Sequence, residues 1–326
     1  MRARGYRSST SPGRSRWHAL PTLVRLMFRL WRSRPDVVHG NLLEGSLLAL
    51  LAGRLTGVGR LVYSRHHTTH NHKYFPKRGV FYDRLINRMA HRIVAISSNV
   101  HEVLTRMEKV PEEKVVTIRH GFDLSRPAPE DPMREARLRA KYGITDASPH
   151  PRIGVVARPF AWKGLDHVIP AFAEVLRHWP DARLMIFHWK NSGHAAHYEA
   201  MLDRLPWRNW RTVNWETDLD ELFHVFDVLV HVPEDPLSEP FGYVYVEALT
   251  SGTPSVFTLS GILRELDLRQ LHGVRTVPFK DAAAITNAIG EWVKDPPARD
   301  ARRANARSNT GYLQGVIGMR RKMERL

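Results

Sequence analysis

Four charged residues in the second half of the chain have types and spacings that suit a phosphorylated sugar. Arg158 and Lys163 lie in the stretch VVARPFAWKG, and Glu239 and Glu247 lie in EPFGYVYVEALTSGTP, with seven residues between the two glutamates. A cationic pair can neutralise a diphosphate. Two separated carboxylates can accept hydrogen bonds from the hydroxyls of a sugar at one end and of a ribose at the other.

The stretch between the two glutamates adds backbone donors. A helix is expected to begin near Gly242, and its first N–H groups have no partner inside the helix. The N–H groups of Phe241 and Gly242 can therefore donate to phosphate or sugar oxygens. Glycine at position 242 also lets a ligand approach the backbone closely. Glu239 would precede this helix, and Glu247 would lie about two turns into it.

A second unusual stretch, SRHHTTHNHKYFP at residues 64–76, contains His66, His67, His70 and His72. A zinc site needs three or four ligands in tetrahedral geometry, which a loop would supply only by folding around the ion. The chain has no cysteine, which excludes thiolate zinc sites and disulfides. Asp218 in the DLD triplet is expected to cap a helix. No metal site is predicted. The histidines are expected to line a cleft, with His67, His70 and His72 as loop or acceptor-facing groups.

Two runs of alternating strands and helices must position these residues. Short β-branched segments, such as 36–40, 60–66 and 114–121, alternate with helical segments, and the alternation starts again at residue 152. This pattern is typical of parallel sheets with crossover helices, hence of two Rossmann-like α/β domains. Ligands of such sheets bind at the carboxyl ends of the strands. Arg158 and Lys163 follow the first strand of the second domain, and the histidine cluster follows the strand at 60–66.

The expected domain organisation follows from composition. The predicted segments are a disordered basic segment at 1–16, an N-terminal domain at 17–125, a linker rich in proline and charge at 126–150, a second domain at 151–296 and a C-terminal helical segment at 297–326.

The net charge of +16 predicts a polyanionic partner or reflects a basic proteome. The candidate partners are nucleic acid, an anionic membrane surface and a phosphorylated substrate. No run of apolar residues is long enough to span a membrane. The segment at 20–34 predicts a helix with an apolar face and arginines opposite: Leu23, Leu26, Met27, Leu30 and Trp31 form that face. Packing against a sheet is the favoured interpretation, and lying on an anionic membrane is the alternative.

These motifs resemble the retaining glycosyltransferases of the GT-B fold, in the glycosyl transferases group 1 family. The resemblance covers about residues 20–310 and rests on the Arg, Lys-Gly and E-x7-E segments. RPDVVHG, VAISSNV and VVTIRHGFD match more weakly. The resemblance implies a sugar transferred from a nucleotide donor with retention of configuration, without a metal ion or other cofactor. The base is not indicated.

The resemblance also implies roles for individual residues. Arg158 and Lys163 would hold the donor diphosphate. Glu239, with the backbone at Phe241 and Gly242, would contact the donor sugar, and Glu247 the ribose. His66 would lie beside the donor sugar and act with Glu239 in catalysis. The expected acceptor is a glycan or lipid-linked glycan, and the expected location is the cytoplasm with peripheral contact to an anionic membrane.

The chain departs from the family pattern at its start. It begins near the third or fourth βα unit, so an incomplete N-terminal domain with about four core strands is expected. IFHWKNSG also replaces a usual Gly-x-Gly turn, and His120 stands where asparagine is common. One alternative is therefore a truncated, non-catalytic relative that binds nucleotide sugars. A basic nucleic-acid-binding protein is a weaker alternative, because no recognition module is evident.

Overall fold

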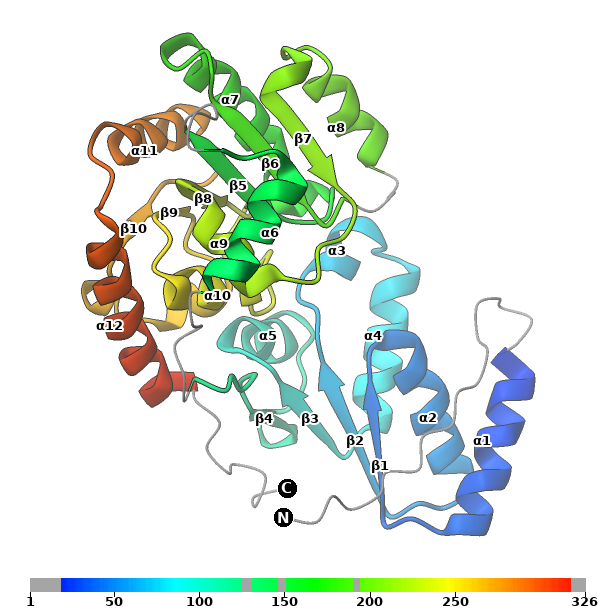
Figure 1. Ribbon diagram of the computed structural model, residues 1–326. Coiled ribbons are helices and arrows are strands. Elements are labelled where there is room, and N and C mark those ends of the chain that lie inside the picture. The colour runs from blue at the N-terminus through cyan, green and yellow to red at the C-terminus, as the bar shows by residue number, and fades with distance from the viewer. Residues whose placement is uncertain (1–18, 125–130, 146–150, 190–193, 318–326) are drawn as a thin grey trace. The chain divides into compact units, whose positions relative to one another are not determined.

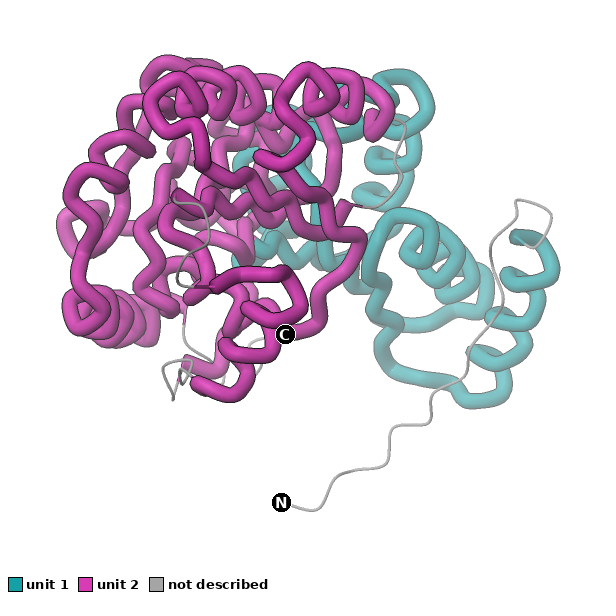
Figure 2. The backbone as a smooth tube through the Cα atoms, turned by 45° about the horizontal axis from the view of Figure 1, so that its top comes forward, with its two compact units in different colours: residues 1–96, 100–118 teal, residues 97–99, 119–326 magenta. Residues whose placement is uncertain are grey.

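The computed structural model describes residues 19–124, 131–145, 151–189 and 194–317. The chain divides into two compact units, shown in different colours in Figure 2. Unit 1 comprises residues 1–96 and 100–118, and unit 2 comprises residues 97–99 and 119–326. The predicted disordered segment 1–16 lies outside the described residues, as do parts of the predicted linker and of the predicted C-terminal segment.

Unit 1 is built on a four-stranded parallel sheet in the order β1-β2-β3-β4. The strands are β1 Val37–Asn41, β2 Arg60–Arg65, β3 Arg92–Ala95 and β4 Val115–Thr117. The helices are α1 Ala19–Ser33, α2 Leu43–Leu55, α3 His70–Tyr74, α4 Arg78–Met89 and α5 Ser98–Glu102, whose first two residues belong to unit 2 and which continues as a π-helical stretch at Val103–Met107. Figure 1 shows this β–α alternation along the blue and cyan part of the chain.

The sheet of unit 1 is stabilised by apolar side chains of its strands, which become buried when the sheet packs against helices. In β2, Leu61 and Tyr63 are fully buried. Helix α2 packs very closely on this strand, since a Cβ at Gly53 would lie 2.6 Å from a methyl carbon of Leu61. Because β1 and β2 pair in parallel, their carboxyl ends lie side by side, with Asn41 in register with Ser64.

Unit 2 is built on a six-stranded parallel sheet in the order β10-β9-β8-β5-β6-β7. The strands are β5 Arg152–Val156, β6 Arg183–Phe187, β7 Trp210–Val213, β8 Val228–His231, β9 Ser255–Phe257 and β10 Val274–Thr276. The helices are α6 Pro132–Tyr142, α7 Leu165–His178, α8 Ala195–Leu202, α9 Leu219–Val225, α10 Tyr243–Ser251, α11 Ala282–Lys294 and α12 Arg299–Ile317.

Helices cover both faces of this sheet, so its central strands are buried throughout. Every residue of β5 is buried, as expected for a central parallel strand. On one face, Ile153 and Val155 join a core with residues of α7, α8 and α11. On the other face, a Cβ at Gly154 would lie 2.3 Å from the ring of Phe226, which closes the space beneath α9.

The predicted α/β architecture with two parallel sheets is confirmed, while three details of it were wrong. The histidine segment, predicted to be a loop, contains helix α3 at His70–Tyr74. The predicted strand at 114–121 ends at Thr117. Strand β10 was not predicted at all, because its three residues include Arg275 and Thr276, which are not typical of a buried strand. It forms only because β9 offers a parallel edge.

Candidate functional site

The loop after β5 packs closely against the loop after β8, so that side chains of the two loops lie near each other. A short 3-10 helix at Ala161–Lys163 ends at Gly164, whose φ is 78°. A Cβ at Gly164 would lie only 1.9 Å from the carbonyl oxygen of Val232. A residue with a side chain would thus be both strained and blocked at this position. Glycine here lets Lys163 reach the chain that follows β8.

Lys163, Glu239 and His231 form a buried charged group at the carboxyl edge of the sheet. The Nζ of Lys163 donates to Oε2 of Glu239 at 2.6 Å, and it lies 4.1 Å from the centre of the Trp162 ring. Nε2 of His231, at the end of β8, lies 3.2 Å from the same carboxylate oxygen. Glu239 is 5% exposed and His231 is 1% exposed. Lys163 and Glu239, predicted from sequence to share a site, are therefore in direct contact.

The electrostatics of this group hold Glu239 ionised. Burial raises the pKa of Glu239, but the Lys163 charge and the His231 hydrogen bond outweigh it and bring the pKa to about 2. Burial lowers the pKa of His231. A neutral His231 donates from Nε2 to Glu239, and its Nδ1 then has no partner among the described residues.

Helix α10 begins directly beside this group. Its N-cap, Gly242, has a φ of 86°, and a Cβ there would lie 2.4 Å from the Tyr245 ring and 3.0 Å from Cγ of Glu239. Within the part of the chain that the structure describes, no hydrogen bond uses the N–H of Phe241 or of Gly242. Two backbone donors at a helix N-terminus therefore remain available beside Glu239.

Glu247 lies further along α10 and has an unusual environment. Burial, with a smaller effect from the Asp220 carboxylate, raises the pKa of Glu247 to about 7. The side chain is partly buried, and it has no hydrogen-bond or ion-pair partner in the described ranges. The Tyr243 hydroxyl, whose pKa is raised by burial and by Glu247, is the other titratable group beside it. A half-buried carboxylate that receives no hydrogen bond from the described chain can accept a hydrogen bond from a ligand.

Arg158 completes the set on the loop after β5. Its side chain is exposed, and it makes no hydrogen bond or ion pair with any residue that the structure describes. A fully charged guanidinium without a partner, at the carboxyl edge of a parallel sheet, is available to an anionic ligand. The six residues proposed from sequence as donor contacts all belong to unit 2, in the loops after β5 and β8 and in helix α10: Arg158, Lys163, Glu239, Phe241, Gly242 and Glu247.

Residues that sequence reasoning missed hold the Glu239 loop in place. The Glu239 N–H donates to Oγ of Ser260 at 3.1 Å. Nδ2 of Asn99 donates to the carbonyl oxygens of Glu239 at 3.0 Å and of Pro236 at 2.7 Å. His231 had a detectable signal, because it is the one polar residue in the apolar run VLVHV. Ser260 and Asn99 had none, since their role depends on contacts distant in sequence.

His66, the predicted catalytic histidine, lies in unit 1, whereas the other predicted site residues lie in unit 2. It follows β2 directly, and its Nε2 lies 3.3 Å from Oδ1 of Asn41 at the end of β1. Burial, and then the neighbouring His67 and His39, lower the pKa of His66, so the ring is neutral at pH 7. Its place at the carboxyl edge of the sheet agrees with the prediction, while its catalytic role stays a prediction.

The remaining histidines of the cluster were predicted to be loop or acceptor-facing groups, and two of them have a different role. Arg65 is fully buried and pairs with two buried carboxylates, Asp83 at 2.9 Å and Glu108 at 2.7 Å. His67 Nε2 lies 2.9 Å from Asp83, and His72 Nε2 lies 3.0 Å from Glu108. These two rings therefore complete an internal ionic network that anchors the segment after β2.

Asp218, the first residue of the DLD triplet, was predicted to cap a helix. It does stand at the N-cap of α9, but its side chain makes no capping hydrogen bond. The carboxylate instead pairs with the guanidinium of Arg134 on α6, with Nε at 3.0 Å. The ion pair competes successfully for this carboxylate because Arg134 offers two N–H groups in a fork.

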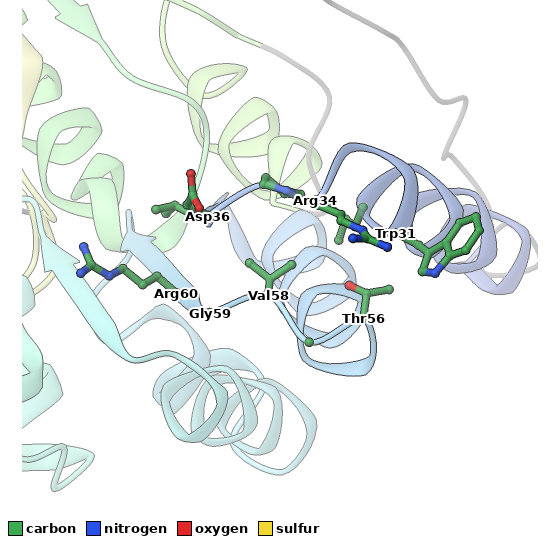
Figure 3. Close-up of a pocket in the computed structure, with 11 residues that line it drawn as sticks. Trp31, Arg34, Asp36, Thr56, Val58, Gly59 and Arg60 are labelled. Carbon is green, nitrogen blue, oxygen red and sulfur yellow. The ribbon is translucent and has the colours of Figure 1, made fainter.

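A hollow of about 850 Å³ lies in unit 1, away from the carboxyl edge (Figure 3). It is lined by Trp31 and Arg34 from the end of α1, and by Asp36 and Arg60, which adjoin the starts of β1 and β2. Ligands of open α/β sheets bind at the carboxyl ends of strands. This hollow is at the amino ends and is not part of the candidate donor site.

Comparison with curated proteins finds an uncharacterised glycosyltransferase of Methanocaldococcus jannaschii. It is 29% identical over 215 residues, which cover 62% of this chain and 51% of that protein. The chain thus spans about half the length of the curated relative that it matches.

Solved structures share the fold. The crystal structure of Anabaena HepE in complex with UDP-glucose has a TM-score of 0.78 at 19% identity, covering 93% of this chain and 80% of that one. The structure of WaaG, a glycosyltransferase involved in lipopolysaccharide biosynthesis, has a TM-score of 0.61 at 17% identity, covering 90% and 91%. These similarities confirm the predicted GT-B-like fold with two Rossmann-like domains.

Two family models match the chain in succession. Glycosyltransferase Family 4 matches residues 2–126. Glycosyl transferases group 1 matches residues 139–309, which is more than half of the chain and includes the six candidate residues named above. The protein is therefore a member of the glycosyl transferases group 1 family.

Proposed function

We propose that this protein transfers a sugar from a nucleotide-sugar donor to a glycan or lipid-linked acceptor, with retention of configuration. The observation that carries the proposal is the buried Lys163–Glu239 pair beside the unpartnered N–H groups at the start of α10. This arrangement offers a cation and backbone donors for a diphosphate, and an ionised carboxylate for sugar hydroxyls.

In the proposed reaction, charge develops on the leaving diphosphate. The bond between the anomeric carbon and the diphosphate oxygen breaks, and the acceptor oxygen bonds to that carbon on the same face. The acceptor proton passes to the departing phosphate. Lys163, Arg158 and the N-terminus of α10 stabilise the charge that builds on the diphosphate. Because side chains and backbone supply this compensation, we propose chemistry that needs no metal ion.

The carboxylates and His66 have separate proposed tasks. Glu239 stays ionised well below neutral pH, so it can accept from donor-sugar hydroxyls at any physiological pH. Glu247 accepts from the ribose hydroxyls, which supply the donors that its carboxylate lacks in the chain itself. A neutral His66 contributes a ring nitrogen from unit 1 that positions the reacting groups.

The comparisons support particular choices of probe. HepE has been crystallised with UDP and with UDP-glucose, which makes these the first donor molecules to test. WaaG takes part in lipopolysaccharide biosynthesis, which supports a cell-envelope glycan as the acceptor class. No helix within the described ranges is both long and apolar enough to cross a bilayer. We propose a cytoplasmic protein that contacts the anionic membrane surface peripherally.

Donor binding is tested by thermal shift with UDP, GDP and ADP and their glucose conjugates. A nucleotide at about 100 times its Kd stabilises the fold by about 2.7 kcal/mol, a shift of several degrees in Tm. Arg158→Ala should weaken that shift without changing the Tm of the free protein, since Arg158 has no partner among the described residues. Arg208→Ala is the matched control, an exposed arginine just before β7 at the opposite edge of the same sheet.

Turnover is tested separately. Incubation of the full chain with the donor that binds and with lipid-linked glycan acceptors, in the presence of EDTA, should yield a glycosylated product whose anomeric configuration matches the donor by NMR. Inverted product, or product only when a divalent cation is added, would refute retention or metal independence respectively. A donor shift with no product for any acceptor would favour the non-catalytic binding alternative.

A further inference from the structure

Helix α1 exposes a stripe of large apolar side chains. Leu20 is 70% exposed, Val24 57%, Phe28 61% and Trp31 62%. On a helix with 3.6 residues per turn, these four positions fall within roughly 80° of one another around the axis. Four large apolar residues on one exposed face are more than the single scattered side chains that a protein surface normally carries.

The stripe is not the side of α1 that holds the helix on unit 1. Helix α1 packs against α2, and the half-buried residues lie on the flank that adjoins one side of the stripe: Leu23, Leu26, Met27 and Leu30. Trp31 was predicted to lie on the packed face, but it is mostly exposed and belongs to the stripe. The helix therefore has two apolar sides, of which α2 covers only one.

Arginines border the stripe on its other side. Arg25, Arg29 and Arg32 are exposed, and they fall within roughly 60° of one another around the axis. The helix contains no acidic residue. Trp31 also lines the hollow at the base of α1, together with Arg34, Asp36 and Arg60 (Figure 3). The surface that adjoins the stripe is thus cationic as well as amphipathic.

From this geometry we infer that α1 is a docking surface for an anionic lipid bilayer. The four apolar side chains enter the boundary between headgroups and acyl chains, and the arginines bind lipid phosphates. Tryptophan at the end of the stripe suits this boundary, because its ring is apolar and its N–H needs a polar partner. The proposal names the membrane-contacting element and does not depend on the donor site, which lies in unit 2.

Arg34 provides a variant that changes the charge beside the stripe without destabilising the fold. It ends α1 with a φ of 43°, and its N–H donates to the Leu30 carbonyl at 2.8 Å. Glycine is the usual residue in such a left-handed position, because a side chain there is sterically unfavourable. Arg34→Gly should therefore keep or raise the Tm of the protein, while it removes one charge beside the stripe.

The test is co-sedimentation of the full chain with vesicles of phosphatidylcholine alone, or with about one third phosphatidylglycerol. We expect binding only to the anionic vesicles, and its loss at about 0.5 M NaCl. Trp31→Ser should weaken binding at least tenfold, and Arg34→Gly about fivefold. Trp207→Ser is the matched control, because Trp207 is 82% exposed but lies in unit 2, and it should bind as the unchanged protein does.

Several results would overturn the inference. These are no binding to anionic vesicles, binding that survives Trp31→Ser, and equal loss with Trp207→Ser. Sedimentation velocity of the free protein gives a further one: a dimer that Trp31→Ser dissociates would make the stripe an interface between two copies. The UDP thermal shift is measured on the same variants and should be unchanged, so a failed donor site and a failed docking surface give different results.

Discussion

Replacing Glu247 with glutamine tests the most unusual electrostatic feature of the candidate site. Raising the pKa of a carboxyl from 4.5 to about 7 corresponds to about 3 kcal/mol, at about 1.4 kcal/mol per pKa unit. Glu247 is partly exposed, so water screens some of this cost, and we expect about 1–3 kcal/mol. Glutamine has the same shape and no charge, so Glu247→Gln removes the cost of burying the ionised group.

The sign of the pH dependence follows from proton counting. Between pH 4.5 and about 7 the folded chain keeps a proton on Glu247 that the unfolded chain has released. The free energy of unfolding therefore falls as the pH rises through this window, and the full penalty applies above it. Below pH 4.5 both states are protonated, and Glu247→Gln should match the unchanged protein.

The assay is the Tm difference between Glu247→Gln and the unchanged protein from pH 4.5 to 8.5. For a unit of this size, each kcal/mol shifts Tm by about 2–4 °C, so the variant should melt several degrees higher at pH 8 and equally at pH 4.5. Glu174→Gln is the control, because Glu174 is exposed on α7 and forms an exposed ion pair with Arg177. A gap that does not change with pH would refute the reasoning.

The same variant also separates stability from binding. If the Glu247 carboxylate accepts ribose hydroxyls, UDP should bind about 10–100-fold more weakly to Glu247→Gln at pH 8, since hydrogen bonds to a charged group contribute about 1.5–3 kcal/mol. A higher Tm with unchanged UDP affinity would keep the electrostatic argument and remove the ribose role.

Three further changes have defined outcomes. Gly164→Ala should lower Tm by several degrees, because the new Cβ meets the Val232 carbonyl at 1.9 Å; an unchanged Tm would mean that the loop moves freely. Arg65→Met should destabilise unit 1 by about 3–5 kcal/mol, since it removes the guanidinium that neutralises two buried carboxylates, and urea unfolding followed by circular dichroism measures this. Lys163→Met should raise the pKa of Glu239 and weaken UDP binding in calorimetric titrations at least tenfold, whereas equal affinity would remove Lys163 from the donor site.

Much of the fold, and the loops and helix that carry the candidate site residues, could be predicted from sequence, because those features depend on neighbouring residues. Alternating apolar runs and helical periods are local patterns, and they predict two parallel sheets. The loop that carries Arg158 and Lys163 follows a strand directly. The Gly242 turn and the helix that carries Glu247 are likewise consecutive in the chain. The carboxyl-edge rule then places these segments together without knowledge of any long-range contact.

The ionic network of unit 1 could not be predicted, because its members are distant in sequence. Arg65 lies 18 residues from Asp83 and 43 residues from Glu108. Taken singly, a histidine-rich loop and scattered acidic residues look solvated. In the folded chain these groups are buried, and a buried arginine must be paired with carboxylates. His67 and His72 then form hydrogen bonds with the same carboxylates. Two of the four histidines that were expected to line a cleft are therefore part of this internal network.

The sequence by itself determined the order of strands and helices, the loop chemistry of the donor site and the amphipathic character of α1. Only the tertiary structure decided which charges are buried, which face of α1 remains exposed, and that His231 and Ser260 hold Glu239. The physical reason is that helical period, turn formation and charge type are local properties of the chain. Desolvation and pairing depend instead on groups brought together from distant positions, and the pKa values of Glu239 and Glu247 follow from that assembly.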